Sequence, residues 1–342
     1  MPNRQLENTR LITGSLVVLA TLGSAVAMHY TQVVLVPFVL AIFIVSLVSP
    51  ILDFQVLRLK FPRTLAVTFS LLIVLVIIAA MFLLAYQAIE AVIAAIGRYS
   101  DSFANLAERI FQQISDWGID LDQGKITDSL RNQIPKFATN TLGTVFGLGS
   151  MIIFVFIFVI FLLAGRNPHI VHSGVYADID QKVRRYIATK LAVSTVTGIL
   201  VWVALSIIGL ELAGVFGILA FLLNFIPSIG SVISTFLPIP IAVAQFQNPW
   251  LIVLAIAVPA TIQMVIGNVI EPKLMGKGLN LHPVTVLLAL SFWSLLWGVV
   301  GMFLATPITA VIRIVLLQFD TLKPIGNLLA GELPGSEKRV AQ

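Results

Sequence analysis

The polar side chains best placed to do chemistry lie in one apolar stretch of the C-terminal half. Residues 250–270 carry Gln263, Gly267 and Asn268, and the run ends at Glu271. Gln263, Gly267 and Glu271 are spaced four apart, and Asn268 and Glu271 three apart, so a helix would place them on one face. Two amides and a carboxylate could hydrogen-bond a hydroxylated solute, or coordinate a cation if Glu271 is ionised. The alternative is that they hydrogen-bond to neighbouring helices and hold a bundle together.

A second polar group interrupts the apolar stretch that precedes this one. Asn224, Ser228 and Gly230 lie close together, with Pro227 between them. Proline cannot continue a regular helix, so backbone carbonyls near Pro227 can become free as ligands. The alternative is a kinked helix whose Ser and Asn side chains satisfy the local backbone. The predicted substrate- or ion-binding residues are therefore Asn224, Ser228, Gln263, Asn268 and Glu271.

Prolines and glycines flank these polar groups at positions where a helix would have to break or leave room. Such residues remove a backbone donor or a side chain, and they commonly mark breaks in membrane helices. The predicted backbone-shaping residues are Pro227, Gly230, Gly267, Pro272, Gly276, Pro283 and Pro307.

Motifs of enzymes and metal sites are missing from the sequence. The chain has no cysteine, which excludes disulfides, thiolate metal sites and cysteine nucleophiles. His169 and His172 are three apart, but Pro168 precedes them and no nearby carboxylate completes a metal site. Gly276-Lys277 is followed by glycine instead of Ser or Thr, so it is not a P-loop. We expect no enzymatic activity, no cofactor and no bound metal.

The composition places these residues in a membrane protein. The 342 residues are 58% hydrophobic and 11% charged, with a mean hydropathy of +1.00. A soluble domain carries about 25% charged residues, and it needs that polar surface to cover its core. The net charge of +5 comes mainly from Lys and Arg at the ends of apolar blocks, where they meet lipid headgroups. We therefore expect the lipid bilayer, and no nucleic acid, as a partner.

Apolar blocks long enough to cross a bilayer recur along the chain. They predict an all-α polytopic membrane protein with about eight membrane segments. The segments are expected at residues 11–28, 33–52, 64–86, 148–164, 191–210, 213–247, 250–270 and 283–317. The expected division is N-terminal membrane helices at 1–87, an extracytoplasmic helical segment at 88–147, a membrane helix with a cytoplasmic interfacial helix at 148–190, a C-terminal transport region at 191–320, and a cytoplasmic tail at 321–342.

Two of these blocks are interrupted, one before and one after the intact block 250–270. Residues 213–247 are broken by the Asn224–Gly230 cluster and two later prolines, and residues 283–317 by two glycines and Pro307. Paired interruptions of this kind favour helical hairpins that enter the membrane from opposite faces and hold a substrate site. Ordinary full spans with kinks are the alternative.

The basic residues predict the orientation of the chain. Lys and Arg cluster before the first block, between the second and third, and near the C-terminus, so both termini are expected in the cytoplasm. The basic stretch that ends at Lys190 is expected to form an interfacial helix, with its basic side toward headgroups. Arg313 is expected to snorkel to the interface. Residues 88–147 then form a small extracytoplasmic helical cap, with one helix beginning near Thr127.

Two ordered motifs resemble a known family. The run Asn-Val-Ile-Glu-Pro-Lys-Leu-Met-Gly-Lys-Gly-Leu-Asn-Leu-His-Pro at 268–283 resembles the signature of the autoinducer-2 exporter family, the PerM-like permeases. Asn-Phe-Ile-Pro-Ser-Ile-Gly at 224–230 resembles its second hallmark, and Val-Pro-Phe at 36–38 and Gly-Met-Phe-Leu-Ala-Thr-Pro at 301–307 fit as well. The resemblance implies a multi-pass protein of the bacterial inner membrane that forms homo-oligomers, with a pentamer plausible. It also implies export of autoinducer-2, a small polyhydroxylated quorum-sensing signal.

The expected function is therefore a secondary transporter that exports a small polar solute by alternating access, with a proton or sodium ion as a possible coupling ion. Residues 213–318 would move against a scaffold of earlier spans, and Glu271 could carry a coupled proton. Some relatives are described as sodium(lithium)/proton antiporters, so that function is one alternative. A non-transporting membrane scaffold is another.

Overall fold

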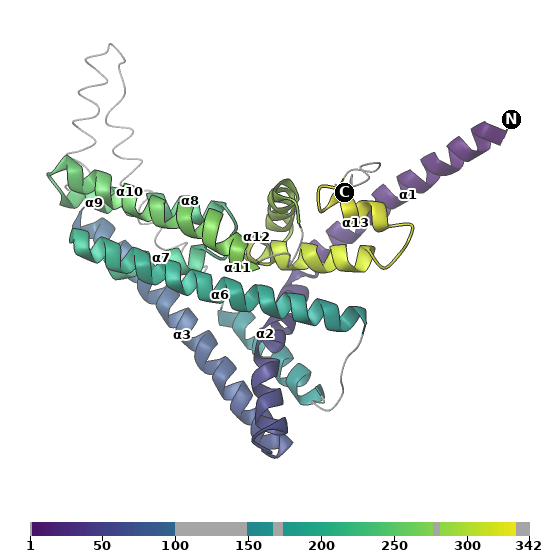
Figure 1. The fold of residues 1–342 in the computed structure, drawn as a ribbon, viewed down its shortest axis with the longest axis horizontal. Helices are drawn as coiled ribbons and strands as arrows, with labels where there is room; N and C mark the ends of the chain where they lie inside the picture. Colours follow the sequence, from purple (N-terminus) through teal and green to yellow (C-terminus); the bar gives the residue numbers. More distant parts are fainter. Residues whose placement is uncertain (1, 100–148, 167–173, 276–280, 333–342) are drawn as a thin grey trace, which may run out of the picture.

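The computed structural model describes residues 2–99, 149–166, 174–275 and 281–332 (Figure 1). Every regular element in these ranges is a helix. Within them, six helices are long and apolar enough to cross a bilayer, and three shorter apolar helices accompany them. The chain is thus a multi-pass membrane protein, and the predicted all-α polytopic fold is confirmed. Most of the predicted extracytoplasmic cap, from residue 100 onward, and Gly276 lie outside the described residues.

The first three helices separate into one outlying helix and a V-shaped pair. Helix α1 (Pro2–Tyr30) projects away from the body, whereas α2 (Gln32–Leu57) and α3 (Arg63–Arg98) diverge from a tight turn (Figure 1). The helix Gly149–Gly165 packs with this pair. Their shared core consists of small and branched side chains, which let helices approach closely. Its buried members are Ala41, Val48, Val74, Val155, Val159 and Leu163.

Helix α6 (Val175–Ile208) is one continuous helix of 34 residues. The predicted interfacial helix is therefore wrong as a separate element, because its residues continue directly into the next span. The reason is that its basic side chains find protein partners in place of headgroups. The Arg184 guanidinium donates to Asp180 at 2.7 Å and to the Ser49 hydroxyl of α2 at 2.9 Å, and Ser46 donates to Asp180 at 2.8 Å. These contacts fix the first half of α6 to α2.

The first interrupted block is a helical hairpin that packs on α6. It consists of α7 (Ala213–Leu223), α8 (Ile229–Phe236) and α9 (Ile239–Gln245). With 11 residues, α7 is about 16 Å long, roughly half the hydrocarbon thickness. The chain then reverses, and Gln245 returns to the start of the hairpin, where its amide donates to the Gly209 carbonyl at 2.8 Å and accepts from the Glu211 N–H at 2.7 Å. The predicted hairpin is thus present.

Close backbone contact holds α7 against α6. A Cβ added to Gly217 would lie 2.6 Å from the Trp202 Cβ, and one added to Gly198 would lie 2.8 Å from the Gly217 carbonyl oxygen. Glycine at both positions therefore permits a contact that any larger residue would prevent. The base of the hairpin is held by α3, because Arg98 pairs with Glu211 at 2.7 Å.

The second interrupted block is also a hairpin. Helix α12 (Pro283–Leu316) changes direction at Gly298, whose backbone is non-helical, with φ 61° and ψ −141°. The Trp293 indole N–H donates to the Thr309 hydroxyl at 3.2 Å, although residues 16 apart in a straight helix would lie roughly 24 Å apart. A Cβ at Gly301 would fall 1.9 Å from the Trp293 carbonyl oxygen. The two limbs of α12 are therefore in direct backbone contact.

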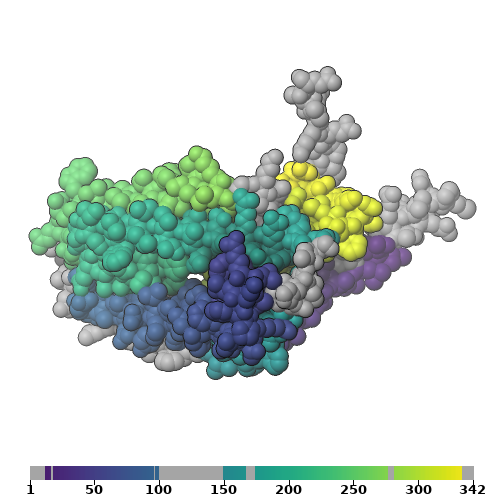
Figure 2. All heavy atoms as spheres, turned by 60° about the horizontal axis from the view of Figure 1, so that its bottom comes forward, coloured from purple at the N-terminus to yellow at the C-terminus, as the bar shows by residue number. Residues whose placement is uncertain are grey.

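The remaining helices connect and brace the two hairpins. Helix α10 (Pro249–Val265) continues through the π-helical segment η1 (Ile266–Ile270) into α11 (Glu271–Met275). Helix α13 (Lys323–Leu328) closes the second hairpin, because the buried Arg313 donates from Nε to the Gly326 carbonyl at 3.0 Å. The prediction that Arg313 snorkels is thus wrong. Figure 2 shows α6 on one face of the molecule, between the helices of the C-terminal half and α3.

Candidate functional site

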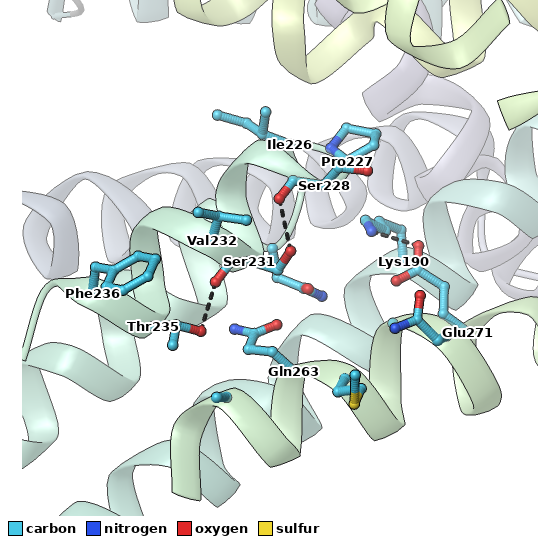
Figure 3. A pocket seen from close by; sticks show the side chains of 15 residues that line it. Lys190, Ile226, Pro227, Ser228, Ser231, Val232, Thr235, Phe236, Gln263 and Glu271 are labelled. Carbon is cyan, nitrogen blue, oxygen red and sulfur yellow. Dashed lines mark hydrogen bonds and ion pairs between the residues drawn. The ribbon is translucent and has the colours of Figure 1, made fainter. Parts of the chain in front are cut away.

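A polar cavity of about 340 Å³ lies between the first hairpin, α6 and the helix α10–η1–α11 (Figure 3). The turn after α7 and the face of α8 form one wall, and the end of α10 with η1 forms the opposite wall. The structure brings all five predicted binding residues to this one cavity, although they come from separate segments. Those that line it are Asn224, Ser228, Gln263, Asn268 and Glu271, together with Pro227 and Gly267 from the backbone-shaping set.

A buried ion pair closes one end of the cavity. The Lys190 ammonium of α6 donates to Glu271 Oε1 at 2.5 Å, and the two side chains are 4% and 17% exposed. A charge in such a place is costly unless it is paired, because water no longer stabilises it. Lys190 and Glu271 are the only ionisable groups among the described residues that line the cavity, so its wall carries no net charge.

The two buried amides are held by serines. Asn224 donates from Nδ2 to the Ser194 hydroxyl at 3.0 Å, and Gln263 donates from Nε2 to the Ser234 hydroxyl at 2.7 Å. The Ser234 proton is already committed to the Ser231 carbonyl at 3.0 Å, so Ser234 can only accept from Gln263. This fixes the orientation of the Gln263 amide and directs Oε1 away from Ser234.

The Gln263 Oε1 atom is buried and has no hydrogen-bond partner in the described part of the chain. An unsatisfied buried acceptor costs about 1–3 kcal/mol, so it requires an explanation. Because Gln263 lines the cavity, a solute that offers a hydroxyl or another donor would satisfy it.

The tip of the first hairpin is held in a sharp turn. Ser228 has φ 61° and ψ −53°, a conformation that residues with a Cβ rarely adopt. A Cβ on Gly230 would lie 1.7 Å from the Leu223 carbonyl oxygen, so only glycine fits there. Pro227, which directly precedes Ser228, cannot donate a backbone hydrogen bond, and this keeps α7 from running on into α8. Local strain of this kind gathers at functional sites.

The opposite wall owes its shape to Pro272. Proline lacks an N–H, so Pro272 cannot bond to the carbonyl of Asn268, four residues earlier. The five residues of η1 directly precede this break and adopt π-helical bonding. Such π-bulges occur frequently at functional sites. Gly267, within η1, has no atom within 4 Å of the place where a Cβ would lie, so it leaves open space beside the cavity.

The other two predicted backbone residues lie outside the cavity, in the second hairpin. Pro283 is at the first turn of α12, and Pro307 is buried in its second limb. The two hairpins nevertheless meet, because Phe225 stacks on Phe303 with ring centroids 4.8 Å apart. A second cavity of about 170 Å³, almost entirely apolar, lies beside this stack. Lys190 lines both cavities.

The sequence did not reveal the role of Lys190. Its position at the end of a basic stretch indicated an interfacial residue, although an apolar run follows it directly and the polar stripe of residues 263–271 ends in a carboxylate, Glu271. Ionisable residues that enter a membrane pair with one another, which was the available signal. Ser231 and Thr235 also line the cavity and were not predicted as site residues.

The arrangement suits binding better than bond-breaking chemistry. No group of three or more His, Cys, Asp or Glu side chains that could hold a metal ion occurs in the part of the chain that the structure describes. The cavity offers amides, hydroxyls and one neutralised ion pair. The amides and hydroxyls can hydrogen-bond a small polar solute, and the Glu271 carboxylate can exchange Lys190 for another partner.

Comparison with known proteins agrees with this interpretation. The model of a family described as "AI-2E family transporter" matches residues 16–320. The chain is similar to "AI-2 transport protein TqsA" of Escherichia coli (strain K12), with 31% identity over 88% of this chain and 91% of that protein. It is 26% identical to "Putative transport protein YhhT" of the same organism, over 84% of this chain and 85% of the relative. A "Putative transport protein" of Borreliella burgdorferi is 33% identical over 62% of each chain.

Proposed function

This chain belongs to the AI-2E transporter family, and from that premise we propose that it is a secondary transporter that exports a small polar solute through the cavity at the first hairpin. The relatives are named as transport proteins, which agrees with a membrane transporter and not an enzyme. The observation that carries the proposal is the cavity itself, where a strained hairpin tip, a π-helical segment and a buried ion pair converge.

The proposed solute is autoinducer-2. The name of the Escherichia coli relative supports this choice, and so does the cavity, whose wall is uncharged overall and rich in amides and hydroxyls. The hydroxyl groups of a polyhydroxylated solute could donate a hydrogen bond to Gln263 Oε1, which has no donor partner among the described residues. In this proposal Asn224, Ser228, Gln263 and Asn268 hydrogen-bond the solute, and Glu271 responds to a coupling proton.

The proposed mechanism is alternating access. The broken C-terminal half would move against α2, α3 and the helix Gly149–Gly165, so that the cavity opens to one side at a time. Two features support this division. An apolar cavity of about 170 Å³ lies between α2, α3, α6 and the two hairpins. The hairpins contact each other through apolar side chains, among them the stacked Phe225 and Phe303 and the buried Ile226, and such contacts can change without breaking hydrogen bonds.

The experiment is a flux measurement in reconstituted vesicles. Purified protein is reconstituted into liposomes, and the liposomes are loaded with autoinducer-2. Efflux of autoinducer-2 and sodium-for-proton exchange are then measured in the same preparation. Gln263→Leu is the test variant. Its control is Gln318→Leu, the same substitution at an exposed residue that follows α12 and does not line the cavity. Loss of one satisfied hydrogen bond should raise the KM for autoinducer-2 by about tenfold in the first variant only.

Each result of that experiment has a clear meaning. Solute efflux that is impaired only by Gln263→Leu supports the proposal. Sodium–proton exchange without solute efflux replaces it with the antiporter function. Flux of neither kind favours a non-transporting scaffold.

We further propose that the chain lies in the bacterial inner membrane with both termini in the cytoplasm, and that it forms a homo-oligomer. The support for an oligomer is α1, because none of the side chains in its described apolar window is buried within the chain. Only the C-terminal end of α1 reaches the body, where the Trp297 indole donates to the Met28 carbonyl at 3.2 Å. Cross-linking between cysteines introduced along α1 in native membranes tests this proposal, and the absence of any cross-linked species would contradict it.

A further inference from the structure

The buried ion pair has a feature that solute binding alone does not require. Glu271 is the only carboxylate among the described residues that line the polar cavity, and the ammonium of Lys190 is bonded to it at 2.5 Å. The two groups come from elements far apart in sequence, α6 and α11. An uncharged pair of similar volume would hold two helices together at least as well, because burying two charges is costly. The ion pair is therefore better explained by an effect on which ligands or ions the cavity binds than by a role in holding the helices together.

The cavity contains the oxygen ligands of an alkali cation. Sodium and lithium are hard cations that bind carboxylate, amide, hydroxyl and backbone carbonyl oxygens, as other hard cations do. Glu271 supplies a carboxylate, and Gln263 supplies a buried amide oxygen that has no partner in the described residues. Asn268 lines the same wall, and its side-chain amide adds a further oxygen.

Lys190 already provides the positive charge that such a site would attract. Its ammonium has the charge of one sodium ion and is a compact point charge on a flexible stem. A sodium ion could reach Glu271 only by displacing this ammonium, which would then be buried without a partner at 4% exposure.

We propose that Lys190 is a tethered cation that occupies the position of a coupling alkali ion, and that it determines the ion specificity of this transporter. With Lys190 in place the cavity binds solute without sodium or lithium. Without Lys190 the Glu271 carboxylate becomes a sodium or lithium site. This inference rests on the proposed function only in taking the cavity as the transport site.

The test is ion binding by purified protein, measured as the shift of Tm in detergent with NaCl or LiCl against choline chloride at equal ionic strength. Wild type should show no cation-specific shift. Lys190→Met should gain a saturable sodium-specific rise in Tm, corresponding to binding at least about tenfold tighter than in wild type. The double variant Lys190→Met with Glu271→Gln should lose it, because the carboxylate is gone.

A matched control lies on the same helix. Lys182 pairs with Asp178 at 2.9 Å, and both side chains are well exposed, at 36% and 46%. Lys182→Met removes a lysine–carboxylate pair of α6 away from the cavity, so it should behave as wild type. Lys190→Arg keeps the positive charge and should also show no sodium effect.

The inference is overturned if wild type is stabilised specifically by sodium or lithium, a result that needs no variant to fold. It is also overturned if Lys190→Met folds and shows no cation preference, or if Lys182→Met gains the same preference. The ion-binding and flux measurements distinguish failure of this inference from failure of the proposed function. Absent solute flux with the expected binding pattern refutes the proposed function alone, whereas solute flux in wild type that requires sodium refutes the role of Lys190 alone.

Discussion

Replacing Gly230 by alanine should prevent the first hairpin from closing. The added Cβ would lie 1.7 Å from the Leu223 carbonyl oxygen and 2.6 Å from its carbon, whereas ordinary contacts begin at 3.4 Å. The obstructing atoms belong to the backbone, so no side-chain rotation relieves the contact. To lengthen the 1.7 Å distance to an ordinary 3.4 Å, the two limbs must move apart by about 1.7 Å. Overpacking usually costs about 1–3 kcal/mol even where side chains can adjust.

Separation of the limbs also disturbs contacts on either side of the tip. The Asn224–Ser194 hydrogen bond and the Phe225–Phe303 stack lie a few residues away, and each contributes roughly 1 kcal/mol. We therefore expect a loss of at least about 3 kcal/mol, which lowers Tm by roughly 4 °C for a protein of 342 residues.

The measurement is thermal unfolding of the purified variant in detergent. Gly267→Ala is the matched control, because it adds the same methyl group at the opposite wall of the cavity, where nothing lies within 4 Å. It should unfold close to the Tm of wild type. Gly301→Ala, whose Cβ would meet the Trp293 carbonyl oxygen at 1.9 Å, should behave like Gly230→Ala. Wild-type stability of Gly230→Ala would refute the reasoning, since the hairpin could not then be closed as described.

Three further predictions follow from charged and titratable groups. Lys190→Met and Glu271→Gln should each destabilise the protein by up to about 3–5 kcal/mol, because each leaves the other member of the pair charged and without its partner. In a Tm measurement, the double variant should recover part of that loss. Full additivity would contradict direct pairing. Arg313→Met should loosen α13 and expose its backbone to faster hydrogen exchange, because the bond to the Gly326 carbonyl is lost, and unchanged exchange would argue against this brace. The hydrogen bond to Glu211 raises the pKa of Tyr99 above its ordinary value of about 10. The bond therefore contributes its full stabilisation below pH 10, and this stabilisation is lost as the pH rises through the pKa of Tyr99 in the folded protein. The absorbance difference between wild type and Tyr99→Phe should show phenolate forming only above about pH 10.

The hairpins were predictable because their cause is local. Pro227, Gly230 and Gly298 change the backbone directly, and neither block has the length for two full spans with a connecting loop. The interruption and its position can therefore be found by inspecting the sequence. The close approach of the limbs could not be predicted in the same way, because it depends on which carbonyl each glycine faces.

Charged residues were harder to interpret, because their partners are distant in sequence. Lys190 and Glu271 are 81 residues apart, and Arg313 meets a backbone carbonyl on a later helix. Hydropathy assigns such residues to the nearest interface, which suits a side chain that faces lipid headgroups. It fails for one that faces another helix, and the continuous α6 shows the consequence, since its basic half binds α2 and α11 instead of forming an interfacial helix.

The polar stripe that first indicated the site illustrates how a local break can improve a pattern. In a regular helix Asn268 shares a face with Glu271, three residues later, but it lies about 140° around the axis from Gln263, at the edge of the predicted stripe. The π-helical segment changes this, because its i→i+5 bonding advances the chain by a smaller angle per residue. Asn268 is thereby turned toward the wall that already holds Gln263 and Glu271. Pro272 removes the α-helical donor to the Asn268 carbonyl and so favours the π-helical segment.

Replacing Pro272 by alanine should therefore let a regular helix form through residues 266–270, turn Asn268 away from the cavity, and weaken solute binding while leaving the Lys190–Glu271 pair intact. Unchanged solute KM in Pro272→Ala vesicles would show that the bulge does not position Asn268.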